Sequence, residues 1–278
     1  MTRSPRSAAI SGVIAASLTL FSCATSTAPQ KGTPAFYWAA AKETFATRDY
    51  MKTIDHLEHA ASGDSEYSKR AQAWLLVLTS GLANGYMELA EQYEAGATAN
   101  KTSPTPFRLQ VATCRRYANQ LGLSFADKFE KFQQAKDDTF ELDFSFPGGS
   151  ATLGPSVTKI SSGVMPTASE IESTQKRALE RGILLATCRA AGAPEDPAKT
   201  QGLFKDPPVK VPRAVMFAAM ANALYAQSQL YLPRKLDDPE KMRIFCSRAQ
   251  EALKTVPESK ETKELNSKIQ AALKRAKV

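Results

Sequence analysis

Two histidines in this chain have the residue type and the spacing to bind a metal ion. His56 and His59 are its only histidines, and they lie three positions apart beside Asp55 and Glu58. On a helix the two imidazoles would share one face and could hold a metal together. Zinc motifs that can be identified from sequence have more ligands at fixed spacings. A histidine pair beside acids is more typical of a solvated helix face, so we predict no metal site.

No other arrangement of residues matches a catalytic motif. The sequence has no Gly-x-Ser-x-Gly elbow and no dinucleotide-binding glycine loop. Gly148-Gly149 is a turn signal, and the residues after it do not suit a phosphate site. Carboxylates from distant segments could still converge in a cleft. From the motifs we predict a protein that is not an enzyme and has no cofactor.

Cys23 ends an apolar run at the start of the chain. Arg3 and Arg6 are the only charged residues before it, and residues 8–21 are small or apolar apart from hydroxyl-bearing residues and one glycine. A basic start, a short apolar core and small residues before a cleavage site are typical of a secretory signal. A membrane-spanning helix needs a longer run of ~20 apolar residues. We therefore predict that residues 1–22 are a signal peptide.

The residues around Cys23 resemble the lipobox of bacterial lipoproteins. Leu20, three positions before the cysteine, and the small Ser22 match that family's motif, whereas Phe21 is bulkier than the family's usual residue. The resemblance implies that Cys23 becomes the first mature residue and carries a lipid. The alternative is an ordinary signal peptide with an unrelated cysteine.

The rest of the chain divides into a tether and a folded part. Residues 23–33 are rich in small and polar types and lack the apolar content to fold, which predicts a flexible tether. Residues 34–278 are long enough to bury a core. Within them we expect an N-terminal helical half at 34–136, a β arm at 139–160 and a C-terminal helical half at 166–278.

Composition and charge narrow the classes of partner. Hydrophobic residues make up 43% of the chain and charged residues 23%, which is ordinary for a globular protein. Removing Arg3 and Arg6 from the 36 Lys and Arg leaves 34 against 28 Asp and Glu, a net charge of +6. No block of basic residues is interleaved with aromatics, so we predict no nucleic-acid binding. A mildly basic face could meet anionic lipid or cell-wall material, or be a solvated surface.

Three further cysteines, Cys114, Cys188 and Cys246, follow Cys23. An extracytoplasmic compartment would permit disulfides, and three cysteines allow at most one pair. Each lies among apolar neighbours on a helical pattern. We therefore favour buried thiols over a disulfide.

The first folded segment has the pattern of a helical pair. Thr33-Pro34 is typical of a helix start, and a second helix follows Arg48-Asp49. The pair resembles a tetratricopeptide repeat, a helix-turn-helix unit of about 34 residues. The residues at repeat positions are Tyr37, Ala40, Ala41, Asp49, Tyr50, Leu57 and Ala60. Thr44 and Thr53 depart from that family's pattern, and its closing proline is absent. The resemblance implies a mainly α fold of antiparallel pairs, an α-solenoid.

Apolar stripes at helical spacing continue along the chain. Residues 67–93 predict two helices, with Gly81 and Gly85 allowing a turn or a close helix contact between them. Residues 107–132 predict a longer helix and a shorter one. The N-terminal half should therefore contain roughly three helical pairs.

The C-terminal half shows clear helix starts. Thr167 and Glu170 are spaced as a capping box before a long helix. Residues 192–212 form a long connection with five prolines, with room for a turn of helix near 198–204. Residues 214–231 are apolar nearly all round, which predicts a buried helix. The last helix has one apolar face and is typical of a solenoid cap.

Between the two halves the period changes to that of a strand. The alternating apolar residues are Phe140, Leu142, Phe144 and Phe146. Residues 147–150 are a turn signal, and residues 152–160 could return as a second strand. We expect a hairpin or extended arm that packs partly on the helices and offers its outer edge for strand addition by a partner. The alternative is a hairpin that only seals the gap between the two halves.

Large aromatic residues at helical spacing mostly face a core, and a minority could line the concave groove where solenoids bind peptides. The binding candidates in the groove or on the strand edge are Tyr37, Trp38, Tyr86, Tyr93, Phe144 and Phe146.

Together these features predict a non-catalytic scaffold or adaptor in the cell envelope. It would bind a protein or peptide partner and reach the membrane through a lipid on Cys23. It would face the periplasm, and Ala24 is compatible with sorting to the outer membrane.

Similar lipid-anchored repeat proteins of the T-component group suggest an alternative, a small-ligand-binding accessory component of a tripartite solute transporter. An open groove would favour the peptide partner and an enclosed apolar cavity the small ligand. A third class, a cell-wall enzyme, would need converging carboxylates or an activated hydroxyl in a cleft.

Overall fold

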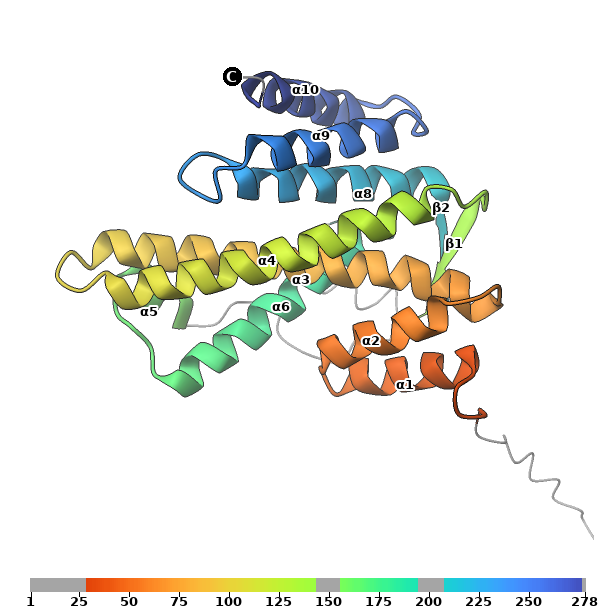
Figure 1. Ribbon diagram of the computed structural model, residues 1–278, viewed down its shortest axis with the longest axis horizontal. Helices are drawn as coiled ribbons and strands as arrows, with labels where there is room; N and C mark the ends of the chain where they lie inside the picture. The colour runs from red at the N-terminus through yellow and green to blue at the C-terminus, as the bar shows by residue number, and fades with distance from the viewer. Residues whose placement is uncertain (1–28, 144–155, 195–207, 277–278) are drawn as a thin grey trace, which may run out of the picture.

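The computed structural model describes residues 29–143, 156–194 and 208–276, and it is mainly helical over these ranges (Figure 1). The elements in chain order are α1 (Pro34–Ala46), α2 (Tyr50–Ala61), α3 (Glu66–Ala99), α4 (Thr105–Phe132), β1 (Thr139–Leu142), α5 (Ser156–Ser161), α6 (Ala168–Ala190), β2 (Val209–Pro212), α8 (Arg213–Ser228), the 3-10 helix η1 (Gln229–Tyr231), α9 (Pro239–Leu253) and α10 (Lys260–Arg275).

The two helices predicted for the first folded segment, α1 and α2, are confirmed, and the hydrogen bonds at their ends are local. The Thr33 hydroxyl accepts a hydrogen bond from the Phe36 amide at 3.3 Å, and Pro34 occupies the first turn. Arg48 has a φ of 64° in the turn between the helices. The Phe45 ring lies 5.8 Å from the Trp74 ring, which packs the pair against α3.

Helices α3 and α4 run side by side along the molecule (Figure 1). The prediction of separate shorter helices in each region is wrong, because both helices continue through their internal glycines. A glycine inside a helix costs about 1 kcal/mol relative to alanine, which packing readily offsets. Of the two roles predicted for Gly81 and Gly85, a turn or a close helix contact, the structure shows the close contact.

That close contact is made by α6, whose predicted capping box between Thr167 and Glu170 is confirmed. A Cβ atom on Gly81 would lie 2.6 Å from the Ile183 Cα, and one on Gly85 would lie 2.7 Å from the Ala178 carbonyl oxygen. The backbones of α3 and α6 therefore meet directly. Only glycine fits there, since real Cβ atoms do not approach backbone atoms this closely.

The strand at the start of the arm is confirmed, but its predicted partner is wrong. Strand β1 pairs antiparallel with β2, with Phe140 opposite Val211. Within the expected returning strand, residues 156–160 belong to helix α5. Phe140 and Leu142 are buried, so their face needs apolar neighbours, and β2 supplies them from a segment that follows α6. The apolar face is covered by the helical core, as expected for the described part of the arm.

Arg213 joins this small sheet to the end of α4. Its guanidinium donates hydrogen bonds to the carbonyl oxygens of Gln133, at 3.1 Å, and Ala135. It also lies 4.2 Å from the centroid of the Phe217 ring. Both carbonyls belong to residues that directly follow α4, so Arg213 fixes the chain where it leaves that helix.

Helices α8, α9 and α10 stack in succession above α4 in Figure 1. As predicted, α8 is buried on several sides, with Met216, Phe217 and Leu224 in the core. The expected start of α9 is also confirmed, since Asp238 accepts a hydrogen bond from the Lys241 amide at 2.9 Å. The final helix presents Ile269 and Ala272 to α9 and its charges to solvent.

Cys114, Cys188 and Cys246 are buried, as predicted. Burial raises the pKa of the Cys114 thiol to about 12, and it also raises the pKa of Cys246. Both thiols therefore stay protonated and inaccessible at mildly alkaline pH.

We expect no reaction of these three cysteines with a thiol reagent in the native protein and full reaction in denaturant. The measurement is the absorbance of the group that the reagent releases. Rapid modification of the native protein would contradict their burial.

Candidate functional site

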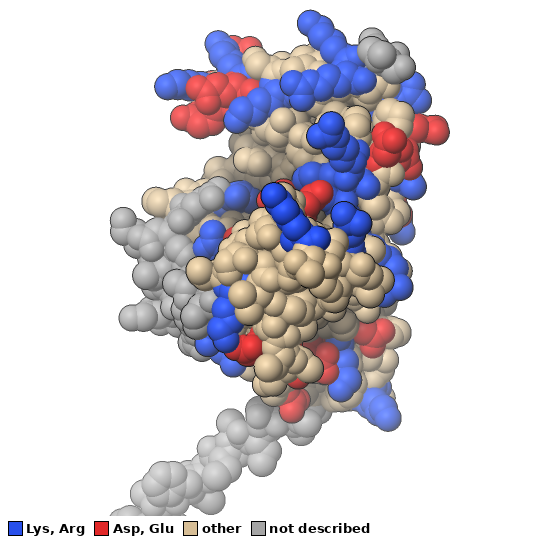
Figure 2. Space-filling view, turned by 90° about the vertical axis from the view of Figure 1, so that its left-hand side faces the viewer, with Lys and Arg blue, Asp and Glu red and all other residues tan. Residues whose placement is uncertain are grey.

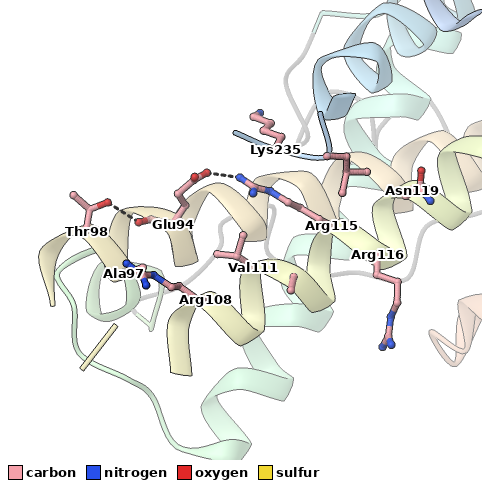
Figure 3. A pocket seen from close by; sticks show the side chains of 11 residues that line it. Glu94, Ala97, Thr98, Arg108, Val111, Arg115, Arg116, Asn119 and Lys235 are labelled. Carbon is pink, nitrogen blue, oxygen red and sulfur yellow. Dashed lines mark hydrogen bonds and ion pairs between the residues drawn. The ribbon is translucent and has the colours of Figure 1, made fainter. Parts of the chain in front are cut away.

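A pocket of about 670 Å³ lies between the C-terminal part of α3, the first half of α4 and the loop after η1 (Figure 3). Its wall holds four cationic side chains, Arg108, Arg115, Arg116 and Lys235. The acidic residue in the wall is Glu94. Figure 2 views the end of the molecule where α3 and α4 meet, and basic side chains outnumber acidic ones on that face.

The pocket is open to solvent and its floor is partly apolar. Val111 and Ala112 line it from α4, between Arg108 and Arg115 in sequence, and Leu236 lines it from the loop. Arg108, Val111 and Arg115 are spaced by three and four residues, so they share one face of the helix. The face therefore presents a cation, an apolar surface and a second cation in order along α4.

Arg115 is the most enclosed of the four cations, with a side chain only 12% exposed. Its guanidinium lies 2.6 Å from the Glu94 carboxylate and also donates a hydrogen bond to the Arg234 carbonyl oxygen at 3.2 Å. Figure 3 shows the ion pair crossing the pocket from α4 to α3. The Glu94 side chain is 47% exposed, so solvent reaches the acidic partner more easily than the arginine.

The loop after η1 is held over the pocket by several contacts. The Tyr231 hydroxyl donates a hydrogen bond to Asn119 of α4 at 2.8 Å. Lys235 pairs with Glu91 of α3 at 3.2 Å. Arg234 has a φ of 69°, a left-handed conformation that turns its carbonyl into the contact with Arg115. The loop thereby supplies both a cation and an acceptor to the site.

Arg108 and Arg116 are exposed, and no carboxylate in the described ranges pairs with either of them. The Arg116 guanidinium lies 5.2 Å from the Tyr117 ring and points away from the Glu94–Arg115 pair in Figure 3. Arg108 lies on the side of Ala97. An excess of unpaired positive charge at a partly apolar opening is suited to an anionic ligand.

A second hollow, of about 490 Å³, lies between the α1–α2 turn and α6. Its wall carries charges of both signs, and Arg48 forms an ion pair with Glu180 across it. This balance of charge gives it no comparable preference for a ligand.

The predicted aromatic candidates lie elsewhere. Trp38 and Tyr93 are buried in the core, and burial raises the pKa of Tyr93 to about 12. Tyr37 is half-buried and stacks on His59 with ring centroids 4.6 Å apart. The Tyr86 hydroxyl accepts a hydrogen bond from Gln175 of α6 at 3.1 Å. None of these four described candidates lines the pocket.

Three other predicted positions, Cys23, Phe144 and Phe146, lie outside the described residues, as does the expected turn of helix near 198–204. His56 and His59 lie on α2, as expected. In the part of the chain that the structure covers, no group of three or more His, Cys, Asp or Glu could hold a metal ion.

Sequence reasoning missed the basic pocket. A local signal for it was present on an amphipathic helix, where Arg115 and Arg116 are adjacent and Arg108 lies seven positions before Arg115. Lys235 and the Arg234 carbonyl come from a loop more than a hundred residues later, so only the fold brings them to α4.

No family model, curated protein or solved structure matches this chain. Among the described helices, none has the length and apolar character needed to cross a bilayer.

Proposed function

We propose that this protein is a non-catalytic envelope lipoprotein, anchored through Cys23, that serves as a scaffold or adaptor for a protein partner. The partner docks a peptide segment in the pocket between α3, α4 and the loop after η1. In this proposal the helical pairs form a tetratricopeptide-like framework, as the residues of α1 and α2 suggest. The observation that carries the proposal is the solvent-open pocket with four cations and one acid in its wall.

The position of the pocket also supports docking. The tether joins the folded part at α1, where the Trp38 ring lies 6.4 Å from Tyr67 near the start of α3. Glu94 follows 27 residues later on the same helix, which corresponds to about 40 Å. The pocket therefore lies near the C-terminal end of α3, whereas α1 lies beside the N-terminal part of that helix (Figure 1). A protein tethered at one end could present the other end to a partner.

The alternative is a small-ligand-binding accessory component of a solute transporter. The volume of about 670 Å³ favours it, since small-molecule sites occupy roughly 300–1,000 Å³. The open mouth, with exposed residues such as Arg108 and Ala112 in its wall, favours a peptide segment instead.

A photoreactive amino acid at position 112 tests the docking proposal. Ala112 is exposed in the pocket wall, so a probe there should crosslink a protein partner in intact cells. Ala271 is an exposed alanine on α10 and serves as the matched control. We expect a specific product from position 112 and none from position 271, detected by immunoblot and identified by mass spectrometry.

Identical products from both positions would contradict docking at the pocket. A small molecule that co-purifies with the protein, with no protein product at position 112, would favour the transport alternative.

A further inference from the structure

We infer that the docked segment is an extended acidic stretch of the partner, whose carboxylate replaces that of Glu94 on Arg115. This inference rests on the proposed function and adds the chemistry of the occupant. Its basis is the order of side chains along α4, the enclosed Arg115 and the exposed Glu94.

The Glu94–Arg115 contact marks where a carboxylate binds. Arg115 stays in place without Glu94, because the Arg234 carbonyl holds a second guanidinium nitrogen at 3.2 Å. A carboxylate entering from solvent meets Glu94 on the exposed side of the pair. Exchange of one carboxylate for another keeps the enclosed Arg115 guanidinium paired, so it avoids the cost of leaving that charge unpaired.

A second carboxylate has a binding place at Arg108, which no described carboxylate satisfies. Seven residues of helix place Arg108 and Arg115 about 10 Å apart along α4. In an extended peptide, side chains four residues apart point the same way and lie about 13 Å apart. Glutamate and arginine side chains are long enough to bridge the difference. The residue midway between the two acids then faces Val111 and Ala112, so it should be apolar.

A membrane surface fits this site less well than a peptide. The pocket lies about 40 Å along α3 from the end where the tether enters. Its cations also line a partly apolar hollow between three segments, rather than forming one continuous basic surface. We therefore assign the site to a peptide segment.

The test is direct binding of the peptide Gly-Ser-Glu-Ser-Leu-Ser-Glu-Ser-Gly, labelled with fluorescein, to the purified mature protein by fluorescence anisotropy. We expect binding that weakens about tenfold in R108E and strengthens about threefold in E94Q, because E94Q removes the competing carboxylate. We also expect weaker binding as salt increases. R275E, on α10, makes the same charge change away from the pocket and should leave the affinity unchanged.

Four results would overturn the inference: no binding, equal binding of the peptide with glutamine in place of both glutamates, equal losses of affinity in R108E and R275E, or weaker binding in E94Q.

Vesicles containing phosphatidylglycerol are the second probe. Vesicle binding that R108E weakens and that the peptide does not compete with would assign the site to lipid instead. Crosslinking from position 112 remains informative in each case. A specific partner there, without binding of the acidic peptide, would leave the proposed function standing and remove only this inference.

Discussion

Replacing Gly182 with alanine is expected to lower the free energy of unfolding by at least about 2 kcal/mol, because overpacking of a tight contact typically costs 1–3 kcal/mol. A Cβ atom at this position would meet the Gly81 carbonyl oxygen and lie 2.9 Å from the Gly85 nitrogen. Both atoms belong to the backbone of α3, so neither can rotate away, and α6 must separate from α3. The measurement is urea denaturation followed by circular dichroism.

Gly122→Ala is the matched control for this prediction. It makes the same substitution inside a helix, where alanine alone would favour the helix by about 1 kcal/mol. The nearest atom to its new Cβ would be the Gln227 side-chain oxygen, at 2.8 Å, and a side-chain end can shift. The G122A variant should therefore lose less stability than G182A. Equal losses at the two sites would show that the α3–α6 contact is no tighter than the rest of the interior.

Cys23→Ala is expected to block lipidation, since it removes the sulfur atom to which a lipid would be attached, and any variant protein that loses its signal peptide should leave the membrane. The measurements are incorporation of labelled palmitate and fractionation of membranes from soluble material. We expect an unlabelled protein that is either uncleaved or released.

The control for this substitution is Ser22→Ala, which keeps a small residue before the cysteine and should be processed and anchored normally. A C23A protein that stays with membranes after removal of its signal peptide would contradict anchoring through this cysteine.

Helix positions were largely predictable because the signals that set them are local. Thr33 before Pro34, Thr167 three residues before Glu170, and Asp238 before Pro239 each satisfy free amides of the first turn with nearby atoms. The apolar face of α10 likewise predicted which side of that helix would be buried, and the nearly all-round apolar character of α8 predicted burial on several sides.

Glycines could not be interpreted in the same way. Gly81, Gly85 and Gly122 could each end a helix or admit a neighbour, and the sequence around them is compatible with either outcome. The long helices α3 and α4 pass through all three, because α6 packs on the first two and Gln227 of α8 on the third. The choice depends on segments that are far away in sequence.

The sequence by itself determined the helical character, most of the helix starts, the buried cysteines and a strand at residues 139–142, since each follows from neighbouring residues. Only the tertiary structure decided that β1 pairs with β2 and that Arg115 lies between Glu94 and the Arg234 carbonyl. Strand partners and charge clusters form between segments separated by many residues. Many segments of the chain could cover the apolar face of a strand or pair with an arginine. Packing of the whole chain selects one of them, because only the fold brings that segment close.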